Sequence, residues 1–64
     1  MPIVTIELWE GRTVEVKRQL VKGITSTVVA NLGVPLDSVW VIIRESPKHN
    51  CAKGGKLASE WASN

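Results

Sequence analysis

The chain has 64 residues, a single cysteine and a formal net charge of +2, from eight basic and six acidic side chains. Its length limits it to one small domain with marginal stability. The single cysteine, Cys51, excludes an internal disulfide. Cys51 and His49 are the only soft metal ligands in the sequence, which is too few for a structural zinc site. With 44% hydrophobic residues, the composition therefore favours stabilisation by oligomer formation. The mild, interspersed charge permits a small anionic ligand and does not require nucleic acid as a partner.

The amino-terminal segment shows no secretory signal. Met1 and Pro2 lead directly into a strand-like run, without a basic region followed by an apolar one. The longest apolar runs are far shorter than the roughly 20 residues that span a bilayer. A lone free thiol suits a reducing compartment, so we expect a cytoplasmic protein that binds no membrane.

The first predicted element is a strand over residues 3–9. Its side chains alternate between two faces, one carrying Val4, Ile6 and Leu8 and the other Thr5, Glu7 and Trp9. The segment 10–12 interrupts this alternation.

A helix is predicted over residues 14–32, with Thr13 at its N-cap and Glu15 in its first turn. Apolar side chains recur along one face every four residues, and two more extend this stripe: the first set is Val16, Leu20, Ile24 and Val28, and the second is Val21 and Leu32. Gly33 is a natural C-terminal stop, and Pro35 prevents the helix from resuming.

A second strand is predicted over residues 38–45, almost continuously apolar, which is typical of a strand covered on both faces. Residues 46–56 read as a polar loop with a turn at Gly54-Gly55, and residues 57–61 as a short tail, either a strand or a helical turn.

The predicted strand, helix and strand make one β-α-β unit with parallel strands. The fold class is therefore α+β, and residues 1–64 form a single domain. Two strands under one helix leave a bare sheet face and open edges, which predicts partner subunits.

Pro2 is the residue that most directly suggests chemistry. Removal of Met1 would leave Pro2 with a free secondary amine, and an α-amino group titrates at about pH 7.7–8.0. Such a group is a candidate general base near neutral pH, or a nucleophile toward carbonyl groups. The alternative is a Met-Pro start without function.

Two arginines are candidate ligands for an anion. Arg12 follows the first strand, where its guanidinium could bind a carboxylate bidentately or could simply be solvated. Arg44 lies near the end of the second strand, where it needs a partner, either a ligand or a structural carboxylate such as Glu45 or Glu7.

Other candidate motifs are weaker. His49 and Cys51 lie two residues apart without an orienting carboxamide or carboxylate nearby, so a cysteine nucleophile has little support. The three tryptophans could stack on bases, but packing is their commoner use.

Several short motifs are spread along essentially the whole chain, and their order and spacing are informative. They are Met1-Pro2-Ile3, Glu10-Gly11-Arg12, Pro35-Leu36-Asp37-Ser38-Val39 followed by Val41-Ile42-Ile43, and Gly54-Gly55-Lys56-Leu57-Ala58-Ser59. In these motifs the chain resembles the 4-oxalocrotonate tautomerase family of the tautomerase superfamily. The resemblance implies a β-α-β subunit that forms dimers and hexamers. It also implies a cofactor-independent, metal-independent enzyme whose amino-terminal proline moves a proton between carbon atoms of an enol or dienol acid.

Carried over by position, the resemblance makes Pro2 the general base and makes Arg12 the residue that binds the substrate carboxylate. Two positions depart from the family pattern. Trp40 stands where the family has a second arginine that reaches in from a neighbouring subunit, and Cys51 stands where it has a phenylalanine. Arg44, on the same strand face as Trp40, is a candidate replacement for the missing arginine. These departures bear on the substrate, which is 2-hydroxymuconate for 4-oxalocrotonate tautomerase itself, more than on the reaction class.

The leading hypothesis is therefore a homo-oligomeric tautomerase that acts on a small anionic enol or keto acid, with Trp40 and Trp9 as candidate walls of the pocket. One alternative within the superfamily is a hydratase, dehalogenase or decarboxylase. A hydratase needs a carboxylate to orient water, and residues 51–56 supply none. Another alternative is a non-catalytic or hetero-oligomeric subunit of the same fold.

Overall fold

The computed structural model describes residues 1–61, so residues 62–64 of the predicted single domain lie outside the described residues. The elements follow the predicted order of strand, helix and strand, and a small hairpin comes after them. They are β1 (Ile3–Trp9), α1 (Val14–Leu32), β2 (Trp40–Ser46), β3 (Ala52–Lys53) and β4 (Lys56–Leu57), with 3-10 turns at Leu36–Ser38, Lys48–Asn50 and Ala58–Glu60. The predicted β-α-β unit is confirmed. Of the two structures predicted for the tail, a strand or a helical turn, the residues beyond β4 form the helical turn.

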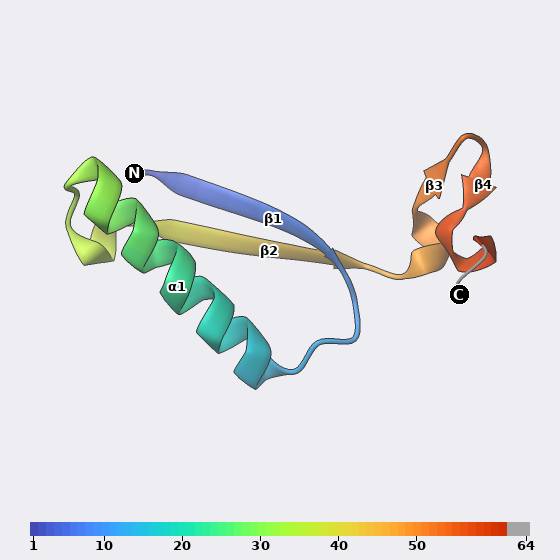
Figure 1. Ribbon diagram of the computed structural model, residues 1–64, viewed down its shortest axis with the longest axis horizontal. Helices are drawn as coiled ribbons and strands as arrows, with labels where there is room; N and C mark the ends of the chain where they lie inside the picture. Colours follow the sequence, from blue (N-terminus) through green and yellow to red (C-terminus); the bar gives the residue numbers. More distant parts are fainter. Residues whose placement is uncertain (62–64) are drawn as a thin grey trace.

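Strands β1 and β2 lie side by side and run parallel, in a register that pairs Ile3 with Trp40 and Trp9 with Ser46 (Figure 1). The Trp40 amide donates to the Pro2 carbonyl oxygen at 2.9 Å, and the Glu10 amide donates to the Ser46 carbonyl oxygen at 3.0 Å. Hydrogen bonding therefore continues past both ends of β1.

The second strand differs from its predicted range, 38–45, at both ends. It begins at Trp40 because residues 36–38 form a 3-10 turn. Both the amide and the hydroxyl of Ser38 donate to the Pro35 carbonyl oxygen, at 3.1 and 2.7 Å, and these bonds close the turn. The strand ends at Ser46, since the last residue of β1 pairs with that residue.

Helix α1 begins and ends where the sequence predicts. The Thr13 hydroxyl accepts a hydrogen bond from the Val16 amide at 3.2 Å. This satisfies one of the amides that have no partner within the helix. At the other end Gly33 adopts a left-handed conformation with φ of 67°, and its amide donates to the Val29 carbonyl oxygen at 2.9 Å.

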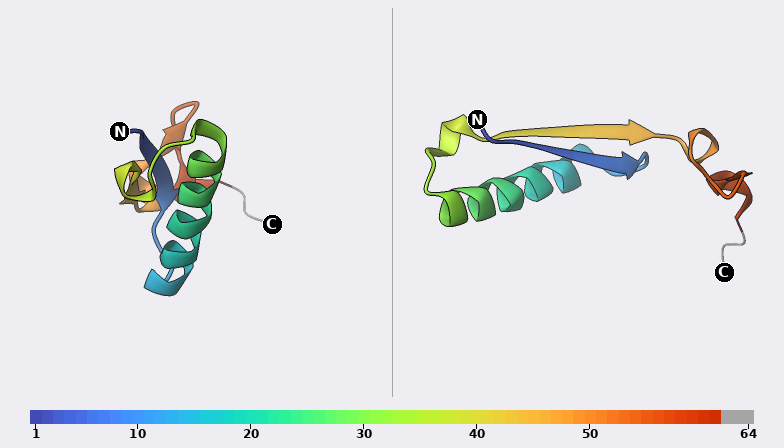
Figure 2. Two further views of the ribbon diagram at one scale, coloured as in Figure 1. Left: turned by 90° about the vertical axis from the view of Figure 1, so that its left-hand side faces the viewer. Right: turned by 90° about the horizontal axis from the view of Figure 1, so that it is seen from above.

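The helix covers only one face of the two-stranded sheet (Figure 2). The side chains on that face are half-buried: Val4, Ile6 and Leu8 from β1 and Val41 and Ile43 from β2. The opposite face is exposed and carries Ile3, Thr5, Glu7, Trp40, Ile42 and Arg44. The second strand was predicted to be covered on both faces, but within residues 1–61 of one subunit only the face toward α1 is covered.

The hairpin of β3 and β4 lies beyond the end of β2, away from the helix (Figure 1). Its two-residue turn is Gly54-Gly55, with φ of 62° and 80°. Two successive positive φ angles match the twist of paired strands, and glycine adopts them without steric cost. The predicted turn is confirmed, and the rest of the predicted loop is more regular than expected.

A single subunit has almost no core. Among residues 1–61 only Ala58 is buried, and several large apolar side chains are exposed, among them Leu32 (62%) and Trp40 (61%). The accessible surface is 4991 Å², whereas a compact monomer of this mass exposes about 4,000 Å². The radius of gyration is 15.2 Å, against about 11 Å for a compact domain of this length. So much exposed apolar surface is typical of a subunit of an assembly.

Candidate active site

Pro2 lies just before β1, at the end of the sheet where both parallel strands begin. It is half-buried, and its carbonyl oxygen accepts the Trp40 amide. The Trp40 side chain is on the exposed sheet face. The structure therefore places the candidate base next to Trp40, the position at which the resemblance implies an arginine.

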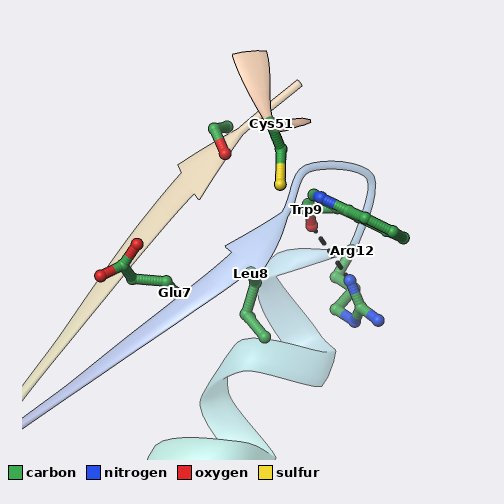
Figure 3. A pocket seen from close by; sticks show the side chains of 6 residues that line it. Glu7, Leu8, Trp9, Arg12 and Cys51 are labelled. Atoms are coloured by element: carbon green, nitrogen blue, oxygen red, sulfur yellow. Dashed lines mark hydrogen bonds between the residues drawn. The ribbon is translucent and has the colours of Figure 1, made fainter. Parts of the chain in front are cut away.

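A hollow of about 270 Å³ lies at the other end of the sheet, where the parallel strands finish (Figure 3). It is formed by the end of β1, the loop that follows it, and the first turn after β2. Its lining residues are Glu7, Leu8, Trp9, Arg12, Ser46 and Cys51. Two of the predicted substrate-binding residues, Arg12 and Cys51, are therefore brought together here.

Arg12 is held at this hollow by the backbone of the strand that precedes it. One guanidinium nitrogen, Nη1, donates to the Trp9 carbonyl oxygen at 3.0 Å. Among residues 1–61, this is the one side-chain hydrogen bond that Arg12 makes, and it has no ion pair there. A guanidinium carries five N–H donors. The remaining donors give it the capacity to bind a carboxylate bidentately.

Cys51 reaches the hollow from the segment between β2 and the hairpin. Its side chain is half-buried and points toward the end of β1, near Leu8 and Trp9 (Figure 3). Its backbone is fixed on both sides, because its amide donates to the Lys48 carbonyl oxygen at 3.3 Å and its own carbonyl oxygen accepts the Ala58 amide at 2.7 Å. This small side chain leaves space where a larger one would fill the hollow.

Arg44 lies on the exposed sheet face, opposite Glu7 in the register. It forms no ion pair with Glu7 or Glu45 within residues 1–61, and Glu45 instead pairs with Lys17 at 2.6 Å. Arg44 is not among the residues that line the hollow. A single subunit thus brings Arg44 neither to Arg12 nor to Pro2.

The length of β1 separates the two groups of predicted site residues. Pro2 and Trp40 lie where the strand begins, whereas Arg12 and Cys51 lie beyond its end. At about 3.3 Å per residue, a strand of this length spans about 20 Å. Pro2 and Arg12 of the same subunit therefore cannot contact one small substrate.

Three residues of the hollow, Glu7, Leu8 and Ser46, were not predicted as site residues. They lie near the ends of β1 and β2, and the carboxyl ends of parallel strands are where α/β folds place ligands. Applied to the predicted β-α-β unit, that rule would have indicated them.

Two other kinds of feature are absent from the described part of the chain. No three histidine, cysteine, aspartate or glutamate side chains in residues 1–61 cluster closely enough to hold a metal ion. Within the same residues, α1 is not apolar enough to cross a membrane, and no other helix is long enough.

Comparison with known proteins defines the class to which the chain belongs. The model of the family described as tautomerase enzyme matches residues 2–60. A probable tautomerase of Bradyrhizobium diazoefficiens is 44% identical over 62 residues, which cover 97% of this chain and 92% of that protein. The chain therefore belongs to the tautomerase family and, within it, to the 4-oxalocrotonate tautomerase family.

Two solved structures support this assignment. YwhB, described as a homologue of 4-oxalocrotonate tautomerase, is 38% identical with a TM-score of 0.88 and covers 95% of this chain and 100% of its own. A subunit of a heterohexameric 4-oxalocrotonate tautomerase from Chloroflexus aurantiacus is 32% identical with a TM-score of 0.87, covering 97% of this chain and 100% of its own. The predicted family is confirmed.

Proposed function

We propose that the chain is a cofactor-independent tautomerase acting on a small anionic enol or dienol acid, with Pro2 as general base once Met1 is removed. The observation that carries the proposal is the position of Arg12. It is held at a hollow that Leu8, Trp9 and Cys51 make partly apolar, and most of its donors are unused by residues 1–61. The similarity to tautomerases along nearly the whole chain supports the reaction class.

The reaction needs one group to move a proton and another to hold the substrate. The Pro2 nitrogen accepts the proton of the enol O–H, electron density moves into the carbon framework, and the protonated amine delivers a proton to carbon. Arg12 binds the carboxylate and stabilises the negative charge that develops during the transfer. Trp9 and Cys51 line the space beside it.

The site is completed between subunits, because β1 keeps the Pro2 and Arg12 of one chain about 20 Å apart. Pro2 of one subunit then approaches the hollow of another. The exposed apolar sheet face, with Ile3, Trp40 and Ile42, supplies surface for such contacts. We propose a homo-oligomer built from dimers up to a hexamer. A structural relative is a heterohexamer, which supports the number of subunits but not their being identical.

Mixing two inactive variants tests the proposal. Pro2→Ala and Arg12→Ala should each lose most of the ketonisation activity on a panel of dienol acids. After the two variants are unfolded and refolded together in equal amounts, about a quarter of the sites combine an intact Pro2 with an intact Arg12 from another chain. Activity should return to that extent. The intact mass must first show that Met1 is absent.

The outcomes separate the parts of the proposal. Variants as active as the parent exclude catalysis by Pro2 and Arg12. Inactive variants that regain nothing on mixing place both residues in a site within one chain, or in a role other than catalysis. Each variant refolded alone is the control.

One observation favours a second candidate, a hetero-oligomeric or non-catalytic subunit. Trp40 stands where the family pattern has an arginine, and a structural relative forms a heterohexamer. If the pure chain, with Met1 removed, is inactive on the whole panel, co-expression with a second subunit of the same fold becomes the decisive test.

A further inference from the structure

Residues 47–61, here called the hairpin unit, form a separate part of the subunit beyond the end of β2 (Figure 1, Figure 2). The hairpin unit is held together from within. The Ala58 amide donates to the Cys51 carbonyl oxygen at 2.7 Å, and the Trp61 amide donates to the Ala58 carbonyl oxygen at 3.2 Å. Ala58 is also the one buried side chain of residues 1–61. The unit is therefore expected to move as one piece.

Within the described chain, no backbone hydrogen bond joins the hairpin unit to the rest of the subunit. The last bond between the strands runs from the Glu10 amide to the Ser46 carbonyl oxygen, one residue before the unit begins. No side-chain hydrogen bond or ion pair among residues 1–61 crosses to the unit either. Its position relative to β1 therefore depends on the packing of side chains.

Trp9, at the end of β1, receives contacts from both ends of the hairpin unit. The Trp61 ring packs edge to face against the Trp9 ring, with centroids 5.8 Å apart and an interplanar angle of 61°. Lys48 Nζ lies 5.0 Å from the centroid of the Trp9 ring. Edge-to-face aromatic pairs and cations close to an aromatic ring are both stabilising arrangements. These contacts therefore hold the unit against the end of β1.

The Trp61 ring is fixed to the hairpin unit as well as to Trp9. Its Nε1 donates to the Lys56 carbonyl oxygen at 3.0 Å, and Lys53 Nζ lies 5.4 Å from its centroid. Because the ring is attached to the hairpin in this way, its contact with Trp9 positions the whole unit.

The position of the hairpin unit matters because the unit supplies one wall of the hollow. Cys51 lines the hollow from the unit, whereas Trp9 and Arg12 line it from the end of β1 and the loop that follows (Figure 3). Arg12 is in turn held by the Trp9 carbonyl oxygen. If Trp61 separated from Trp9, the Cys51 wall would move away from Arg12 and the hollow would open to water.

We infer that Trp61 is a positioning residue that, through its contact with Trp9, keeps the hairpin unit and its Cys51 wall against the hollow. Trp61 is not among the residues that line the hollow, so it acts through Trp9. Lys48 supports the same contact from the other end of the unit. The catalytic part of this inference rests on the proposed function, but the part that concerns the position of the hairpin unit does not.

The reaction of the Cys51 thiol with iodoacetamide tests the inference, because Cys51 is the only cysteine of the chain. The thiol is half-buried, so movement of the hairpin unit should expose it. We expect Trp61→Leu and Trp9→Leu each to raise the reaction rate about fivefold. The double variant should raise it no further, since both changes remove the same contact. Leu57→Ala, which shortens an exposed apolar side chain of the same hairpin, is the control and should react at the parent's rate.

Three results would overturn the inference: an unchanged rate in Trp61→Leu, effects that multiply in the double variant, or an equal rise in Leu57→Ala. If circular dichroism shows that Trp61→Leu is unfolded, Trp61→Phe and Lys48→Met take its place. Phenylalanine keeps an aromatic contact without the Nε1 donor, and methionine removes the cation. Each should raise the rate about two- to threefold. Rates equal to the parent's in both variants would overturn the inference.

Kinetics then separate this inference from the proposed function. With Met1 removed, Trp61→Leu should raise KM for ketonisation of the best dienol acid about fivefold and change kcat less, because Trp61 holds a wall and does not move the proton. Trp61→Phe should recover most of the loss. An inactive parent with the expected thiol reactivities refutes the proposed function and retains the positioning role. An active parent whose KM and thiol reactivity both stay unchanged in Trp61→Leu refutes the positioning role and retains the proposed function.

Discussion

Arg12 combines two tasks in one side chain, since it is fixed to the backbone of β1 and still has donors for a ligand. A planar guanidinium can hold the Trp9 carbonyl oxygen with one nitrogen and a carboxylate with the others. An ammonium group at the same position has only three donors around a single atom. The residue type therefore matters here, in addition to the charge.

Arg12→Lys should lower kcat/KM about tenfold or more, mainly through a higher KM, because the lysine loses the bidentate contact with the carboxylate. Steady-state kinetics on the best acid of the panel measure the change. Arg18→Lys is the matched control, since Arg18 lies on α1 and pairs with Glu15. If kcat/KM changes as little in Arg12→Lys as in this control, Arg12 does not bind the substrate carboxylate bidentately.

At the scale of elements, the most local signals predicted the structure best. Thr13 and Gly33 define the ends of α1 because capping depends on a few neighbouring residues that the sequence displays directly. The alternation in residues 3–9 predicted β1 for the same reason. The helix caps and the alternation of side chains along a strand both depend only on residues that are close together in the sequence.

Thr13→Ala should therefore lower the free energy of unfolding by about 1 kcal/mol per subunit, because the Val16 amide loses its acceptor. Thermal unfolding at a fixed protein concentration measures the change. Thr13→Ser keeps the hydroxyl and should stay close to the parent. Equal destabilisation by serine and alanine would mean that the methyl group of Thr13 matters and the hydrogen bond does not.

The start of β2 and the content of the hollow were harder to predict. Residues 38 and 39 look like strand residues, but Ser38 bonds back to Pro35 and closes a turn, a competition that the apolar pattern does not reveal. Glu7 and Ser46 enter the site through the pairing of two strands far apart in sequence. Pro2 and Arg12 were predicted to act together, although the strand predicted between them, residues 3–9, already implies a separation of about 20 Å within one chain.

At the scale of the whole molecule, the exposed sheet face is the main unsatisfied feature. Apolar side chains such as Ile3, Trp40 and Ile42 gain stabilisation only when another surface removes them from water. A chain of 64 residues also buries only a modest fraction of its surface, so a single subunit is marginally stable at best. Folding and assembly are therefore expected to be one process for this chain.

Ile42→Asp places a charge in the middle of this face and should prevent assembly, because the carboxylate has no cation directly opposite it to offset its desolvation. Analytical ultracentrifugation should detect monomers or unfolded chains, and circular dichroism should show lost structure. Ser26→Asp adds the same charge on an exposed part of α1 and is the control. An intact oligomer of Ile42→Asp would show that the sheet face is not an interface.

The 20 Å between Pro2 and Arg12 also has a consequence for how the protein behaves in a cell. Since the proposed site exists only where chains meet, specific activity should fall on dilution even when substrate is saturating. When the concentration of the chain lies below the dissociation constant of the assembly, the cell would contain the polypeptide but no active enzyme. The level of expression then sets a threshold for catalysis.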